Sequence, residues 1–180
     1  MRIVAGEFKG RRLAGPEGAA TRPTSDKVRE ALFSILGPID GVRVLDLFAG
    51  TGALGLEAIS RGATESVLVE RDRRMAAVIE RNVAEILGGD DGRAKLVRGD
   101  GLRYLAGAAG FDLIFVDPPY AQAAELAPKL VAALPPALAP GARVVTESDR
   151  RLPLELVGSE LSLRSEHIYG DTLIRVFDAP

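Results

Sequence analysis

The 180-residue chain is 47% hydrophobic and 27% charged, a composition that is ordinary for a soluble globular protein with a substantial core. It contains no cysteine, which excludes disulfides, thiolate zinc sites and a cysteine nucleophile. Its apolar stretches are short and its charged start differs from a secretory signal, so we expect a cytoplasmic protein that does not enter a membrane.

The formal net charge of −2 conceals an uneven distribution. Residues 1–29 contain seven Lys and Arg against three Asp and Glu, whereas the remainder contains sixteen against twenty-two. A basic segment on an acidic body is typical of a protein that contacts a polyanion near that segment. A solvated surface hairpin would carry the same charges, so charge alone leaves both interpretations open.

The first elements along the chain are a hairpin and a helix. Stretches 2–5 and 11–14 flank the glycine-bearing segment GEFKG, which predicts a β-hairpin. After a polar stretch, Thr24 or Ser25 can cap a helix whose apolar residues recur at helical spacing. The Gly-Pro pair at 37–38 ends this helix.

From residue 42 onward, strand and helix patterns alternate. The expected strands cover residues 42–49, 65–70, 94–99, 111–116 and 142–148, and the expected helices cover 54–60, 71–87, 102–108 and 121–134. This alternation implies a parallel sheet covered on both faces. The final segment, LSLRSEHIYGDTLIRVFDA, reads as two strands joined at Gly170 and Asp171. The sequence therefore predicts one α/β domain over residues 1–180, with a doubly wound, mostly parallel seven-stranded sheet and a C-terminal antiparallel hairpin.

A glycine-rich loop follows the first strand of the alternating region. Gly50, Gly52 and Gly55 form GxGxxG, which allows a tight turn and a close approach of the backbone to a ligand. Glu70, at the end of the next strand, can accept hydrogen bonds from both hydroxyls of a ribose. The same spacing is found in dinucleotide-binding dehydrogenases, but Asp46 would repel a pyrophosphate and suits a cationic group such as the amine of a methionine moiety. A tight turn without a ligand is the structural alternative.

Two further polar positions follow later strands. Asp100 can hydrogen-bond an adenine amine while Leu102 packs against the ring, although a helix cap explains Asp100 equally well. The strand FDLIFV ends abruptly at DPPY, residues 117–120, which places a carboxylate, two rigid prolines and an aromatic ring at a strand end. A rigid turn with a buried tyrosine would explain DPPY without any chemistry.

Taken together, DLFAGTGALG, Glu70, Asp100 and DPPY resemble the class I S-adenosylmethionine-dependent methyltransferases, in which DPPY marks enzymes that methylate exocyclic amines. The segments GEFKGRRL, RPTSDKVREALFSIL and YGDT extend the resemblance over nearly the whole chain to the bacterial RsmD-type enzymes. Those enzymes methylate the N2 amine of one guanine in small-subunit (16S) ribosomal RNA. The resemblance implies the same activity, a partly assembled ribosomal subunit as the substrate, and an extension over residues 1–40 that contacts RNA.

The resemblance and the chemistry of these residues together assign individual roles. Asp117 and the carbonyl of Pro118 each accept one N–H of the amine, which aims its lone pair, and Tyr120 stacks on the base. The expected S-adenosylmethionine-binding residues are Arg22, Thr24, Asp46, Phe48, Gly50, Gly52, Glu70, Asp100, Gly101, Leu102 and Asp117. The expected substrate-binding residues are Lys9, Arg11, Arg12, Arg22, Pro119, Tyr120 and Tyr169. No metal is expected, and the protein is expected to be a monomer.

Three other functions remain open on the sequence. A DNA or RNA adenine-N6 methyltransferase would also use DPPY, although the DNA enzymes usually carry a target-recognition domain for which 180 residues leave no space. A cofactor-binding assembly factor without catalysis would not need an intact DPPY. A nicotinamide oxidoreductase would need a catalytic set that is not obvious after the glycine loop.

Overall fold

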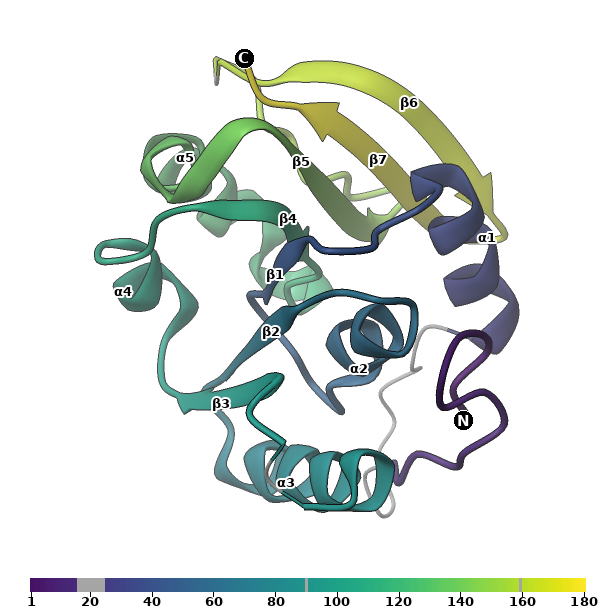
Figure 1. Cartoon of the computed structure of the whole chain (residues 1–180). Coiled ribbons are helices and arrows are strands. Elements are labelled where there is room, and N and C mark those ends of the chain that lie inside the picture. The colour runs from purple at the N-terminus through teal and green to yellow at the C-terminus, as the bar shows by residue number, and fades with distance from the viewer. Residues whose placement is uncertain (16–24, 90, 159) are drawn as a thin grey trace.

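A computed structural model of the chain describes residues 1–15, 25–89, 91–158 and 160–180. Its seven-stranded sheet has the order β3-β2-β1-β4-β5-β7-β6 (Figure 1). The strands are β1 (Arg43–Asp46), β2 (Glu65–Glu70), β3 (Ala94–Arg98), β4 (Phe111–Val116), β5 (Leu138–Asp149), β6 (Ser162–Tyr169) and β7 (Thr172–Asp178). Strands β1 to β5 pair in parallel, and β7 is antiparallel to both of its neighbours. The predicted mixed sheet with a C-terminal antiparallel hairpin is confirmed.

The helices are α1 (Asp26–Leu36), α2 (Ala53–Ser60), α3 (Arg73–Leu87), α4 (Gly101–Leu105) and α5 (Ala123–Ala133), with short 3-10 turns η1 (Tyr120–Gln122) and η2 (Pro135–Ala137). The ends of helix α1 coincide with residue types that commonly cap or end helices. Ser25 Oγ caps α1 by accepting from Val28 N at 3.3 Å, and Gly37 ends the helix with φ 69°. None of the described helices is long and apolar enough to cross a membrane.

The sheet is covered on both faces, as a doubly wound fold requires. Leu113 and Phe115 of β4 belong to a core cluster with residues of α1 and α2, whereas Ile114 and Val116 join residues of α4 and α5 on the other face (Figure 1). This alternation follows from the two-residue period of a strand. The rings of Phe33 and Phe115 meet edge to face, with 5.8 Å between their centres.

The N-terminal arm, residues 1–14, has the antiparallel arrangement of the predicted hairpin but forms no regular strands. Its two halves pair in the antiparallel sense through one isolated bridge, between Arg2 and Arg12, rather than through a ladder of strands. The reason is that the amides of Val4 and Ala5 donate instead to the buried carboxylate of Glu57 in α2, at 2.8 and 3.0 Å. The arm is therefore held both by α2 and by its own backbone hydrogen bonds, such as those from Ile3 N to the Arg11 carbonyl at 2.9 Å and from Leu13 N to the Met1 carbonyl at 3.0 Å.

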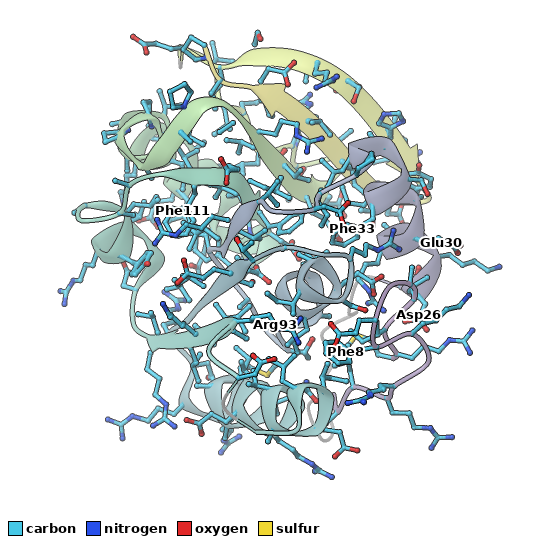
Figure 2. The ribbon with its side chains drawn as sticks, viewed as in Figure 1. Phe8, Asp26, Glu30, Phe33, Arg93 and Phe111 are labelled. Carbon is cyan, nitrogen blue, oxygen red and sulfur yellow. The ribbon has the colours of Figure 1, made fainter. Side chains whose placement is uncertain are left out.

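The tip of the arm is packed against the body of the protein. Phe8 is buried, and the Arg93 guanidinium lies 5.3 Å from the centre of its ring. Both residues are labelled in Figure 2. Phe8 N donates to Ser60 Oγ at 2.9 Å, and Arg93 pairs with Glu7 at 2.8 Å. Packing and hydrogen bonds together fix the position of the arm relative to the sheet.

Candidate active site

The carboxyl ends of the parallel strands gather the predicted site residues at one edge of the sheet. The glycine loop follows β1, Glu70 ends β2, Asp100 follows β3 and DPPY follows β4. Because these strands are parallel and adjacent, their carboxyl ends point the same way. We call this side, formed by the residues at and just after the carboxyl ends of β1 to β5, the carboxyl edge.

The glycine loop needs glycine for two separate reasons. Gly52 has φ 76°, a left-handed conformation that glycine adopts without steric cost, and it forms the N-cap of α2. At Gly55, an added Cβ would lie 2.2 Å from the Leu68 side chain and 2.5 Å from Ser66 Oγ. The third glycine therefore allows α2 to pack closely against β2, and the loop is held tightly enough to present its backbone at the edge.

Glu70 joins the loop to the next strand. Its Oε2 accepts from Gly50 N at 2.9 Å, and its Oε1 accepts from Asp72 N at 2.7 Å. The residue is half-buried, and each carboxylate oxygen has a further lone pair. These features fit a carboxylate that accepts hydrogen bonds from the hydroxyls of a ribose.

Asp100 acts as a helix cap in this structure. Its Oδ1 accepts from Arg103 N at 3.0 Å at the start of α4. The second carboxylate oxygen is a further acceptor, so the cap is compatible with a hydrogen bond to a ligand amine. The two explanations that the sequence left open are therefore not exclusive.

Asp46 is a buried carboxyl group beneath the loop. It is 1% exposed and accepts a hydrogen bond from Gly55 N at 3.2 Å. Burial raises the pKa of Asp46 to about 7, and the negative charge of Glu70 adds to the rise, while the bond from Gly55 opposes it. Asp46 is thus poised to ionise near neutral pH, and a nearby positive charge would favour its ionised form.

Asp117 lies next to two further carboxyl groups. Burial raises the pKa of Asp117 well above its usual value, and the charges of Glu147 and Asp46 raise it further. Glu147 is a buried residue of β5 that the sequence analysis did not select. An acid within the otherwise apolar strand ARVVTES was the available signal.

These carboxyl groups favour a positively charged ligand. Within the described residues, no group of three His, Asp or Glu side chains is arranged to hold a metal ion. S-adenosylmethionine carries a positive sulfonium and a positive ammonium group, which would offset the repulsion among Asp46, Asp117 and Glu147. The residues therefore fit this cofactor, and contact of Glu70 with its ribose and of Asp46 with its amino group stays a prediction.

The DPPY motif presents a main-chain acceptor beside Asp117. Pro118 is buried and Pro119 is exposed. The carbonyl of Pro119 accepts a hydrogen bond from Gln122 N at 2.8 Å, and the 3-10 turn η1 begins at Tyr120. The role of the neighbouring Pro118 carbonyl as an acceptor for a substrate amine stays a prediction.

The remaining predicted cofactor residues lie around the same edge where the structure describes them. Phe48 and Leu102 are half-buried and pack on the core between the sheet and α5. At Gly101, an added Cβ would lie 3.0 Å from the Leu47 carbonyl oxygen, so α4 begins in close contact with the end of β1. Arg22 and Thr24 lie outside the described residues.

Apart from Pro119 and the backbone of Tyr120 in DPPY, the described substrate residues fall into two places, and Arg22 and the side chain of Tyr120 lie outside the described residues. Tyr169 ends β6 at the carboxyl edge, but it is half-buried against the core beneath α1. Lys9, Arg11 and Arg12 are exposed on the arm. Arg11 also donates to the Ile86 carbonyl and lies 4.9 Å from the centre of the Phe8 ring. Their contact with a substrate stays a prediction.

Comparisons with known proteins extend these observations. The family described as "Conserved hypothetical protein 95" matches residues 1–178. Ribosomal RNA small subunit methyltransferase D of Escherichia coli K12 is 35% identical over 181 residues, covering 98% of this chain and 89% of that protein. The solved structure of Escherichia coli yhhF is 33% identical with a TM-score of 0.84, covering 99% of this chain and 97% of that one.

A more distant structure shares the fold. SMU.776, solved as a complex with SAH, is 18% identical with a TM-score of 0.70, and the match covers 86% of this chain and 49% of that one. The family model and the relatives match nearly the whole chain, and the solved structures share its fold. The chain belongs to the RsmD family of ribosomal RNA small-subunit methyltransferases, within the S-adenosylmethionine-dependent class I fold.

Proposed function

We propose that this protein transfers a methyl group from S-adenosylmethionine to the exocyclic N2 amine of a specific guanine in 16S ribosomal RNA. The observation that carries the proposal is the position of Asp117 and Pro118, which follow β4 beside the glycine loop and its acidic partners. The family relationship supports a ribosomal RNA substrate. The choice of guanine N2 rests on the resemblance to RsmD-type enzymes.

The first task of the site is to prepare a poor nucleophile. The lone pair of a guanine amine is delocalised into the ring, whereas the cofactor supplies an electrophilic methyl group that must be attacked in line. Asp117 and the Pro118 carbonyl each accept one N–H, which draws the nitrogen toward tetrahedral geometry and aims its lone pair. Such orientation can contribute roughly 7–11 kcal/mol in well-aligned cases.

The second task is to remove a proton after the N–C bond forms. In its ionised form, a carboxyl group with a raised pKa is a stronger base than an ordinary aspartate. Asp117 can therefore hold the proton that the amine releases, or water can take it directly. Pro119 and Tyr120 are proposed to contact the base, which must be unstacked to reach the site.

We propose that residues 1–40 act as an extension of a single methyltransferase domain, with Lys9, Arg11, Arg12 and Arg22 near the RNA and Thr24 and Arg22 near the cofactor. A partly assembled small subunit in the cytoplasm is the proposed substrate. Tyr169 is proposed to border the base pocket from the end of β6.

The decisive experiment is to incubate the protein with labelled S-adenosylmethionine and undermethylated small-subunit particles, and then to map the modified base. We expect label on N2 of one guanine. Label on adenine N6 would instead support the adenine methyltransferase alternative. Absence of transfer to any ribosomal RNA, with intact cofactor binding, would support a non-catalytic assembly factor.

A variant at Asp117 tests the mechanism. We expect Asp117→Ala to lower the rate of methyl transfer by at least roughly 10²–10³-fold, because one of two acceptors for the amine is lost. Cofactor binding measured by calorimetry should be largely spared. Asp40→Ala, at an exposed aspartate that precedes β1, is the matched control and should transfer methyl groups normally. Unchanged turnover in Asp117→Ala would contradict the mechanism.

A further inference from the structure

Two groups of exposed arginines flank the DPPY motif at the carboxyl edge. Arg71, Arg73 and Arg74 follow β2, and Arg150 and Arg151 follow β5. The strand order places β1 and β4, with the glycine loop and DPPY, between β2 and β5. We call these five residues the carboxyl-edge arginines. They surround the site from both sides.

Arg73 and Arg74 occupy positions that do not help their own helix. They form the start of α3, where the helix dipole disfavours positive charge, and the first turn of α3 contains no acid. Asp72 already caps the helix by accepting from Arg74 N and Met75 N. Within the described residues, neither arginine side chain forms a hydrogen bond or an ion pair. The Asp72 carboxylate at the N-cap partly offsets the charge of Arg74, whereas local stability does not explain Arg73.

Arg71 links the β2 side of the edge to the DPPY side. Its Nη2 donates to Gln122 Oε1 at 3.2 Å, and Gln122 N in turn donates to the Pro119 carbonyl. Because β1 lies between β2 and β4, this contact crosses the carboxyl end of β1, where the glycine loop begins. The guanidinium of Arg71 is therefore placed over the site rather than away from it.

The positive charges of the two arginines that follow β5 are partly offset by a nearby carboxylate. Arg150 and Arg151 lie 3.7 and 3.6 Å from the Asp171 carboxylate, and all three side chains are about half exposed or more. Ion pairs of this length on a surface are weak. These two arginines are available to an incoming anion, with a smaller expected contribution than Arg73 and Arg74.

We propose that the carboxyl-edge arginines contact the phosphate backbone of the RNA substrate and hold it across the DPPY motif. This inference rests on the proposed function and adds a second RNA contact to the one expected on the arm. Phosphate contacts from arginines fix the register of a nucleic acid without reading its sequence. A base presented to Asp117 needs its flanking backbone held on both sides, and the two groups of arginines lie where such backbone would pass.

The test compares two double variants in binding to an unmodified 16S ribosomal RNA transcript. Arg73→Gln with Arg74→Gln removes two charges from the carboxyl edge. The control, Arg81→Gln with Arg164→Gln, removes two exposed charges elsewhere. Arg81 lies later on α3, and Arg164 lies near the start of the outer strand β6, away from the carboxyl edge. Dissociation constants are measured from about 50 to 300 mM KCl, where each lost phosphate contact changes the logarithmic salt slope by roughly 0.7–0.9.

We expect the slope of the Arg73/Arg74 variant to be smaller by about 1.4–1.8, with RNA affinity at least tenfold weaker at low salt. Its affinity for S-adenosylmethionine, measured by calorimetry, should equal that of the unaltered protein. The control variant should keep the original slope. A smaller slope in both variants by the same amount would overturn the proposal, because it would reflect net charge and not position.

Other outcomes separate this inference from the proposed function. If the unaltered protein methylates ribosomal RNA but the Arg73/Arg74 variant keeps its slope, only the surface proposal fails. If the variant is impaired on small-subunit particles but not on the naked transcript, the arginines contact a protein and the proposal is again wrong. If the unaltered protein neither binds nor methylates ribosomal RNA, both proposals fail together.

Discussion

The N-terminal arm and the carboxyl edge are both highly charged, but they use their charges differently. Around the arm, several charged groups are paired within the protein, although Arg29 Nη1 is buried without a hydrogen-bond partner among the described residues. Arg29 of α1 and Glu57 of α2 are completely buried, and their side chains lie 3.4 Å apart. Arg29 also donates to the Arg2 carbonyl and pairs with Asp26 at 2.9 Å.

At the carboxyl edge, like charges lie together. Burial raises the pKa of Asp117, and the charges of Glu147 and Asp46 raise it further, while the side chains of Arg73 and Arg74 form no hydrogen bond or ion pair with the described residues. Charges that are compensated internally stabilise a fold, whereas uncompensated charges cost stability unless a ligand offsets them. The N-terminal arm is basic in composition, as a nucleic-acid contact would be, yet several of the charges in and around it stabilise the fold.

The largest expected effect concerns Asp46 and the pH dependence of stability. Its pKa is about 7 in the folded protein and its usual value is 3.8, so between these values the folded state binds more protons than the unfolded state. The free energy of unfolding should therefore fall by roughly 4 kcal/mol as pH rises from about 4 to 7. Asp46→Asn should remove this loss and be most stabilising, relative to the unaltered protein, at pH values above 7.

Urea unfolding of both proteins at several pH values measures this effect. The control is Asp40→Asn, which makes the same substitution at an exposed aspartate that precedes β1. If Asp46→Asn changes stability by the same amount at low and high pH, the carboxyl edge does not carry uncompensated charge at Asp46, and the contrast with the arm is weaker.

The next effect tests how firmly the arm is held. Gly6 has φ 83°, and an added Cβ would lie 1.7 Å from the Ser60 carbonyl oxygen. Gly10 has a similar φ of 86° with no atom within 4 Å. We expect Gly6→Ala to lower the free energy of unfolding by about 3 kcal/mol, since it combines backbone strain with a clash. Gly10→Ala should cost about 1 kcal/mol from strain alone.

Chemical denaturation of the two variants separates strain from contact. Equal losses for Gly6→Ala and Gly10→Ala would mean that the arm can leave α2 without cost. The arm would then resemble a mobile RNA-binding segment more than a packed part of the fold.

The smallest expected effect distinguishes two neighbouring arginines on the arm. Arg12 is exposed, whereas Arg11 donates to the Ile86 carbonyl at the end of α3. Arg12→Gln should reduce the salt slope of RNA binding by about 0.7–0.9 without changing stability. Arg11→Gln should lower the free energy of unfolding by about 1 kcal/mol, because a hydrogen bond is lost.

Salt titrations and urea unfolding of both variants check this division. An unaltered slope in Arg12→Gln and Arg11→Gln alike would remove the arm from the RNA-binding surface. The carboxyl-edge arginines would then be the principal phosphate contact.

Local patterns in the sequence determined most of the fold and much of the site. Apolar strands alternating with helices predicted a doubly wound sheet, because a parallel sheet must be covered on both faces. The positions of Asp46, Glu70 and Asp117 at strand ends predicted that they would meet, since parallel strands end at one edge. The glycine spacing predicted the loop because backbone geometry there depends on local sterics.

Only the tertiary structure decided which charges are compensated. Glu147 joins Asp117 because β5 pairs with β4 in a particular register, and Glu57 replaces a strand ladder because α2 packs beneath the arm. The energy of a charge depends on its distance from other charges and on its burial. Neither quantity is a local property of the chain, so composition identified a basic arm but could not tell which of its cations the fold already uses.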